Sequence, residues 1–286
     1  MLHTYTFGSA DGPTVLFLHG GATTSNLWRR VTERMPEVRS VLVDMPGHGH
    51  SNHIRWTSLD DTALRLEETM HATLGRLPDH VIGLSLGAYT ATRLLKRNPT
   101  HFKSALLTGM TGKPMPRAWL MKLFTLLVGG FASSRLLTGI SARMMELPDD
   151  AKRAFMEDAK STHGPSARRF LSEIVDLDPA AGVGEITARM LLLSGSKEDK
   201  LIVSSLPHLA ASFKSASSVQ AALLPGLHHA WPLQTPDLAA SVFNAHVFGK
   251  VLPEELEFVP AAPEPAETFK PRGQPENRFA PSGPAP

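Results

Sequence analysis

One short segment, Gly83-Leu84-Ser85-Leu86-Gly87, constrains this chain more than any other feature. It lies between a strand-like run, His80 to Ile82, and a segment typical of a helix, Ala88 to Arg97. A serine in this context predicts a sharp strand-to-helix turn that holds it in a strained backbone conformation at the end of a sheet. Glycine is expected at both flanking positions because a Cβ there would collide where strand and helix cross. The free N–H groups that begin the helix would favour a negative charge beside the serine.

Two apolar runs before this segment predict buried parallel strands. Thr14 to Leu18 is continuously apolar after its first residue and ends in His19-Gly20-Gly21-Ala22, where the glycines leave backbone N–H groups open to a ligand. Ser40 to Val43 leads into Asp44-Met45-Pro46-Gly47-His48-Gly49-His50-Ser51. Taken alone, the first glycine segment could be an ordinary turn after a strand.

The second of these loops resembles the Asp-x-x-Gly-x-Gly-x-Ser loop of the α/β-hydrolase superfamily. With His19-Gly20 before it and the Ser85 turn after it, the order and spacing resemble that superfamily over roughly residues 1 to 250. The resemblance implies a mostly parallel central sheet with helices on both faces, a helical cap and a nucleophilic serine. It also implies that the backbone amides of Gly21 and Leu86 form an oxyanion hole.

Three histidines in the same loop support a competing interpretation. The spacing His48-x-His50-x-x-His53 is similar to the zinc-binding His-x-His-x-Asp-His of metallo-β-lactamase-like hydrolases. Asn52 stands where that motif has aspartate, and no later set of ligands is evident. We therefore expect no metal and no other cofactor, and we expect Asp44 and Gly47 to shape the loop without taking part in chemistry.

A serine nucleophile needs a histidine to take its proton, and the histidine needs a carboxylate to fix its tautomer. In the superfamily the chain order is serine, acid, histidine. The apolar run Arg189 to Leu193 leads into Ser194-Gly195-Ser196-Lys197-Glu198-Asp199, which offers two acids. The resemblance favours Glu198, three residues after the glycine, and Asp199 remains the alternative.

The catalytic histidine is expected after a further strand, Val219 to Leu224. The segment that follows is Pro225-Gly226-Leu227-His228-His229-Ala230-Trp231-Pro232. His229 aligns with the catalytic base of the superfamily, whereas His228 stands where a glycine is more usual. The predicted triad is therefore Ser85, His229 and Glu198.

The pattern of strands stops between about Thr111 and Gly184. Apolar residues there recur at three- and four-residue spacing, as expected for helices; they include Trp119, Leu120, Leu123, Phe124, Leu127, Ala154, Phe155, Phe170 and Ile174. We expect a hydrolase core at 1–110 and 185–250, and a helical cap at 111–184 inserted after the sixth strand. Residues 251–286, with nine prolines, are expected to form a disordered tail.

Composition limits the cellular setting and the partners. The formal net charge is +2 and no block of basic residues occurs, so neither nucleic acid nor an anionic membrane is indicated. The chain has no cysteine, which removes disulfides and thiol chemistry. The first residues lack the apolar region of a secretory signal, and the longest apolar stretch, Ala118 to Ala132, is too short to span a bilayer. We expect a cytoplasmic protein whose partner is a small molecule; the oligomeric state stays open.

The sequence thus predicts a serine hydrolase that acts on a carboxylic ester, or a related acyl substrate, through an acyl-enzyme. The same triad could instead open a lactone, or hydrolyse a thioester or a carbon–carbon bond. A different class also stays open, in which a hydrolase-fold receptor binds a small molecule with little turnover. A panel of activated esters discriminates between the classes because only the enzyme would turn them over rapidly.

Overall fold

The computed structural model describes residues 1–118, 120 and 135–262 of the 286-residue chain. Its centre is an eight-stranded sheet. The strands are β1 (His3–Phe7), β2 (Thr14–Leu18), β3 (Arg39–Asp44), β4 (His80–Leu84), β5 (Ser104–Thr108), β6 (Arg189–Gly195), β7 (Val219–Leu224) and β8 (Glu257–Val259). The apolar runs identified in the sequence correspond to β2, β3, β4, β6 and β7.

The strand order is β1-β3-β2-β4-β5-β6-β7-β8. All neighbours from β3 to β7 are parallel, and only the edge strands β1 and β8 run antiparallel to their partners. The predicted mostly parallel sheet is therefore confirmed. Because parallel strands end at the same edge, this topology gathers the loops after β2, β4, β6 and β7 at one edge of the sheet.

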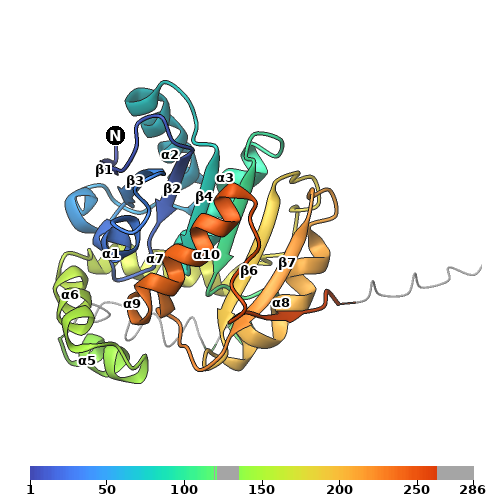
Figure 1. The fold of residues 1–286 in the computed structure, drawn as a ribbon. Helices are drawn as coiled ribbons and strands as arrows, with labels where there is room; N and C mark the ends of the chain where they lie inside the picture. The colour runs from blue at the N-terminus through green and yellow to red at the C-terminus, as the bar shows by residue number, and fades with distance from the viewer. Residues whose placement is uncertain (119, 121–134, 263–286) are drawn as a thin grey trace, which may run out of the picture.

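Helices cover both faces of the sheet (Figure 1). Beside the short η1 (Ser25–Trp28) and η2 (Gly49–Ser51), they are α1 (Arg29–Thr32), α2 (Leu59–Leu74), α3 (Leu86–Arg97), α5 (Arg135–Met144), α6 (Asp149–Lys160), α7 (Gly164–Asp176), α8 (Lys200–Ser212), α9 (Trp231–Gln234) and α10 (Pro236–Phe248). Alternate residues of β2 enter different cores: Leu16 and Leu18 pack with α2, α3 and α8, whereas Val15 and Phe17 pack with α1 and α10. Burial on both faces explains why this strand reads as a continuous apolar run.

The helical segment with α5, α6 and α7 lies between β5 and β6, so it follows the fifth strand of the described chain. The predicted position of this segment was after the sixth strand. Phe155, Phe170 and Ile174 are buried, as their helical spacing predicts. Figure 1 shows α5 and α6 beside the sheet rather than stacked on its faces.

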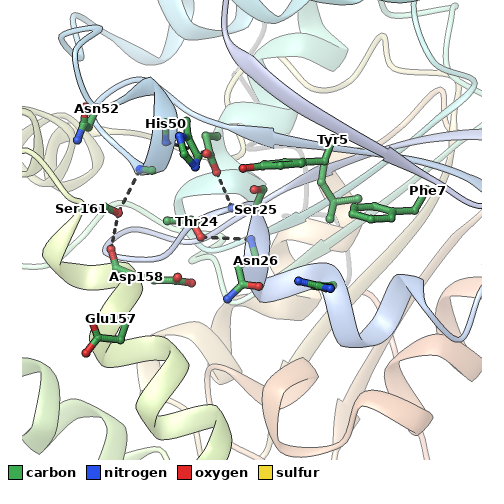
Figure 2. Close-up of a pocket in the computed structure, with 14 residues that line it drawn as sticks. Tyr5, Phe7, Thr24, Ser25, Asn26, His50, Asn52, Glu157, Asp158 and Ser161 are labelled. Carbon is green, nitrogen blue, oxygen red and sulfur yellow. Dashed lines mark hydrogen bonds between the residues drawn. The ribbon is translucent and has the colours of Figure 1, made fainter.

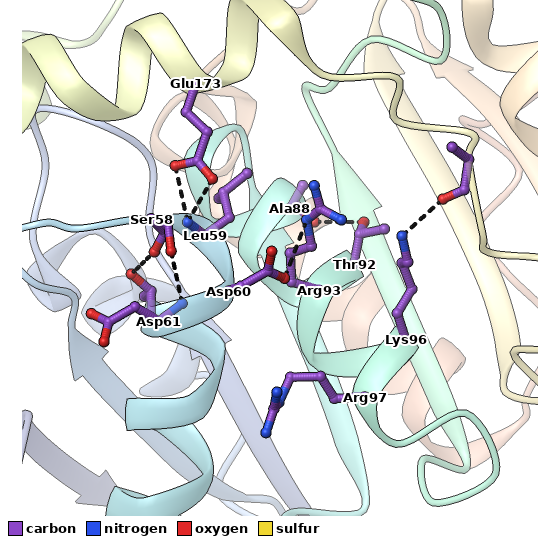
Figure 3. A network of polar contacts seen from close by, with 12 residues as sticks. Ser58, Leu59, Asp60, Asp61, Ala88, Thr92, Arg93, Lys96, Arg97 and Glu173 are labelled. Atoms are coloured by element: carbon purple, nitrogen blue, oxygen red, sulfur yellow. Dashed lines mark hydrogen bonds and ion pairs between the residues drawn. The ribbon is translucent and has the colours of Figure 1, made fainter.

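A polar contact fastens α7 to the core (Figure 3). The backbone N–H of Leu59, at the first residue of α2, donates to both carboxylate oxygens of Glu173 at 2.9 Å. The indole N–H of Trp56 donates to the same carboxylate at 3.3 Å. A carboxylate at a helix N-terminus also interacts favourably with the helix dipole. Glu173 thus supplements Ser58, the N-cap residue of α2.

Two parts of the sequence prediction extend beyond the described residues. Trp119, the run from Leu123 to Leu127, and residues 263–286 of the expected tail all lie outside them. The start of that tail differs from the prediction, because Glu257–Val259 forms β8 and pairs with β7. No helix within the described ranges has both the length and the hydropathy needed to cross a membrane.

Candidate active site

Ser85 occupies the strand-to-helix turn that the sequence predicts. Its backbone has φ 54° and ψ −117°, a conformation that residues other than glycine rarely adopt. Both flanking glycines are required: a Cβ on Gly83 would lie 2.5 Å from the Gly87 carbonyl oxygen, and a Cβ on Gly87 would lie 2.1 Å from that of Leu18. Helix α3 begins at Leu86, and its first hydrogen-bonded turn leaves the Leu86 N–H free of a helical partner.

The loop after β2 passes close to Ser85. A Cβ on Gly20 would lie 3.6 Å from the Ser85 Cβ. The Met45 N–H donates to His19 Nε2 at 3.0 Å, so the other ring nitrogen, Nδ1, carries the hydrogen that reaches the Gly20 carbonyl at 2.8 Å. The Thr23 hydroxyl donates to the same carbonyl at 2.8 Å. Burial lowers the pKa of His19, which keeps the ring neutral.

These contacts orient the peptide between Gly20 and Gly21. No cis peptide bond occurs among the residues that the structure describes, and a trans peptide carries its C=O and N–H on opposite sides. Because His19 and Thr23 hold the Gly20 carbonyl, the Gly21 N–H points away from both of them. A Cβ on Gly21 would lie 3.0 Å from the ring of Phe170 in α7.

Asp44 and Gly47 have structural roles, as expected. The backbone N–H groups of Ser25 and His50 donate to the Asp44 carboxylate at 2.8 and 2.9 Å. Burial alone would raise the pKa of Asp44, but these hydrogen bonds lower it, so the carboxylate stays ionised. Gly47 has φ +79°, and a Cβ there would lie 2.6 Å from the Ser166 Cβ at the start of α7. The loop therefore packs closely against the start of α7.

The three loop histidines lie in different environments. His48 is fully buried and stacks on Phe170 with ring centroids 5.5 Å apart, and burial lowers its pKa to about 3. The ring of His50 lies 4.8 Å from that of His3. His53 is exposed. Within the described ranges, no three potential metal-binding side chains come together.

The loops after β6 and β7 bring Glu198 and His229 together. Glu198 Oε2 lies 3.5 Å from His229 Nδ1, and the Glu198 side chain is 0% exposed while that of His229 is 35% exposed. The other oxygen of Glu198 accepts the Gly195 N–H at 3.4 Å. The 3.5 Å separation is longer than an ordinary hydrogen bond, as is common in active sites without substrate. Within the described residues, no hydrogen bond joins the Ser85 hydroxyl to His229.

The residues next to this pair point elsewhere. Asp199 is exposed and caps α8, where its carboxylate accepts the Leu201 N–H at 2.8 Å. His228 Nε2 lies 3.4 Å from Glu146, a residue in the turn after α5, and Lys197 Nζ lies 3.1 Å from the same carboxylate. Glu146 was not identified from the sequence, since no motif surrounds it.

A cavity of about 550 Å³ opens between β1, β3 and α6 (Figure 2). Tyr5 and Phe7 form one wall, and Asp158 of α6 faces Asn26 on the other. Its lining includes neither Ser85 nor His229, so it is separate from the site described above. Burial raises the pKa of Asp158 to about 6, although hydrogen bonds from Thr24 and Asn26 act in the opposite direction.

Asp158 should make the stability of the protein depend on pH. Between its ordinary pKa of 3.8 and about 6, the folded state retains a proton that the unfolded chain releases. Ionisation therefore costs folding free energy progressively over this window, and the cost is complete above it. In Asp158→Asn this cost is absent, so the unfolding free energy of the variant minus that of wild type should rise by up to about 2 kcal/mol from pH 4 to pH 7.

Urea unfolding followed by circular dichroism at both pH values measures this difference. Asp150→Asn is the matched control, because Asp150 lies in the first turn of the same helix but has a lowered pKa, owing to the Ala151 N–H and then to Arg30. The control should show no such rise. An equal difference at the two pH values for Asp158→Asn would contradict the prediction.

The chain resembles known proteins over most of its length. The sequence model of the Alpha/beta hydrolase family matches residues 15–242. An AB hydrolase superfamily protein of Gibberella zeae is 22% identical over 262 residues, which are 90% of this chain and 87% of that protein. A pimeloyl-[acyl-carrier protein] methyl ester esterase of Vibrio vulnificus is 38% identical over 94 residues, 32% of this chain and 34% of the relative.

Solved structures show the same fold. An esterase from Exiguobacterium antarcticum superposes with a TM-score of 0.74 at 15% identity, covering 86% of this chain and 95% of its own. An enol-lactonase from Burkholderia xenovorans superposes with a TM-score of 0.72 at 16% identity, covering 86% and 96%. At these identities the likeness concerns the fold alone.

Proposed function

This chain belongs to the alpha/beta hydrolase family, and we propose that it is a serine hydrolase that cleaves a carboxylic ester through an acyl-enzyme. The observation that carries the proposal is the strained Ser85, with φ 54°, at the same edge of the sheet as the Glu198–His229 pair. The esterase names of several relatives agree with this chemistry.

In the proposed reaction, Ser85 Oγ attacks the ester carbonyl while His229 Nε2 accepts the serine proton. Glu198 faces Nδ1 of the same ring, so it fixes the tautomer that leaves Nε2 free to accept. The C–O bond to the leaving group then breaks, and His229 returns the proton to the departing alkoxide. Water, deprotonated by His229, then attacks the acyl-enzyme. The bond to Ser85 Oγ breaks, His229 returns the proton to that oxygen, and the acid is released.

The negative charge on the carbonyl oxygen requires donors that are in place before the reaction. We assign this role to the N–H groups of Leu86 and Gly21. The Leu86 amide begins α3 without a helical acceptor, and the helix dipole adds to its attraction for an anion. The Gly21 amide belongs to the peptide that His19 and Thr23 orient through the Gly20 carbonyl.

Between the two candidate acids, the geometry supports Glu198. Its side chain is buried against His229, whereas the Asp199 carboxylate is exposed and occupied in capping α8. Glu198→Gln should therefore lower kcat roughly 1,000-fold or more, because the neutral amide no longer stabilises the imidazolium. Asp199→Asn should change kcat by less than about threefold, since asparagine is itself a good N-cap residue. Steady-state kinetics on one activated ester compare the two, and the reverse ranking would move the acid to Asp199.

The reaction class is tested with a panel of p-nitrophenyl esters from acetate to octanoate, together with an acyl thioester, a lactone and a diketone. We expect turnover of the esters, and the chain-length profile measures the size of the acyl pocket. Phe170 forms part of the cap surface against Gly21, so this ring is expected to limit the acyl chain. Turnover confined to the diketone would replace the ester by a carbon–carbon bond, and ligand-dependent thermal stabilisation without turnover would favour a receptor.

A further inference from the structure

The end of β5 joins the two loops that carry Ser85 and His229. The backbone N–H of Ser85 donates to the carbonyl oxygen of Thr108, the last residue of β5, at 2.8 Å. The indole N–H of Trp231, two residues after His229, donates to the Thr108 hydroxyl at 2.9 Å. Thr108 and Trp231 are both fully buried. One residue thus makes a hydrogen bond to each of the two loops.

The residue after Thr108 supports the imidazole itself. Gly109 has φ +70°, and a Cβ at this position would lie 2.8 Å from His229 Cε1 and 3.1 Å from Nδ1. The ring therefore rests directly on the backbone of Gly109, with Leu84 on the neighbouring side of the same glycine. The position of His229 relative to Ser85 depends on where the chain places residues 108 and 109.

We propose that Thr108 is a positioning residue, which sets the distance between the Ser85 turn and the His229 loop through its carbonyl and its hydroxyl. The inference rests on the proposed function, since it concerns proton transfer between these two residues. Displacement of a reacting group by about 1 Å can cost on the order of 100-fold in rate. A β-branched threonine has few χ1 rotamers, so it holds its hydroxyl in one direction.

Valine is the informative replacement, because it has the shape of threonine but no hydroxyl. Thr108→Val leaves the buried indole N–H of Trp231 without an acceptor, which favours movement of the His229 loop. We expect kcat to fall about tenfold or more while KM stays within about twofold, since the groups that hold the substrate are unchanged. Thr108→Ser retains the hydroxyl and should keep kcat within about threefold of wild type.

The matched control is Thr69→Val. Thr69 is fully buried in α2, and its hydroxyl accepts the Leu2 N–H at 3.1 Å, so this variant also leaves a buried donor without an acceptor. It should lose a comparable amount of stability without loss of kcat. In a double-mutant cycle, Thr108→Val should have little further effect on kcat when Trp231 is already phenylalanine.

The outcomes separate this role from the proposed function. Hydrolysis that survives Ser85→Ala would remove the proposed function, and the positioning role with it. If Ser85→Ala is inactive but Thr108→Val retains the kcat of Thr69→Val, only the positioning role is overturned. Additive effects of Thr108→Val and Trp231→Phe would overturn it as well. Imidazole chemical shifts of His229, measured by NMR without substrate, should change in Thr108→Val and not in Thr108→Ser or Thr69→Val.

Discussion

Ser85→Ala is expected to abolish ester hydrolysis, with kcat at least about 1,000-fold below wild type. The change removes the oxygen that attacks the carbonyl, and neither His229 nor the backbone amides can replace it. The protein should stay folded, because alanine has the same Cβ as serine at φ 54°, and within the described residues the Ser85 hydroxyl makes no hydrogen bond that would be lost. Initial rates on p-nitrophenyl butyrate and the thermal unfolding midpoint measure the two properties.

A second readout makes the assignment specific to this serine. An activated fluorophosphonate should add to wild type at Ser85, as located by mass spectrometry, and should not add to Ser85→Ala. Ser212→Ala is the control, since Ser212 lies at the end of α8 and its hydroxyl donates to the Leu209 carbonyl at 2.6 Å. Retention of wild-type hydrolysis by Ser85→Ala would exclude Ser85 as the nucleophile.

His229→Ala should be nearly as severe as Ser85→Ala. The two residues act as a unit, because the serine is a poor nucleophile until its proton is taken. His228→Ala should lower kcat by less than about fivefold, since the His228 ring approaches Glu146 at 3.4 Å rather than Glu198. This pair of neighbouring histidines supplies a closely matched comparison of two side chains in one loop.

Kinetics on the same ester, together with circular dichroism of each variant, would test this prediction. A harmless His229→Ala and an inactive His228→Ala would transfer the base to His228. The double variant Ser85→Ala/His229→Ala should be no less active than Ser85→Ala alone, as expected when the removal of one residue of the unit already disables the others.

Several features of this chain could be predicted from local sequence. The continuous apolar runs predict buried parallel strands, because a strand covered by helices on both faces has no polar side. The turn at Ser85 could be predicted from Gly83 and Gly87. A Cβ on Gly83 would meet Gly87 within the same strand–helix crossing, whereas a Cβ on Gly87 would meet Leu18 at the end of β2, a contact that only the tertiary structure reveals. The preference for Glu198 over Asp199 came from the resemblance and stays a prediction, and in the structure the Asp199 carboxylate caps α8.

Other features depended on contacts between distant segments. Strand β8 carries no pattern of its own: Glu257 and Phe258 are exposed, and the segment is a strand because β7 provides an edge with free backbone groups. Nothing in the sequence around Asp158 distinguishes it from a surface carboxylate. Its pKa is raised because the folded chain buries it. The helical segment α5–α7 was expected after the sixth strand, and five strands precede it in the described residues.

By itself, the sequence determined the class of sheet, the strained turn and the residue types available for catalysis, because each of these follows from a few consecutive residues. Only the tertiary structure decided how those residues meet. Thr108 and Trp231 are 123 positions apart, and their hydrogen bond exists because β5 lies two strands from β7 in the sheet. Such contacts arise from strand order and from the burial that packs one loop against another, and neither is encoded in a local pattern.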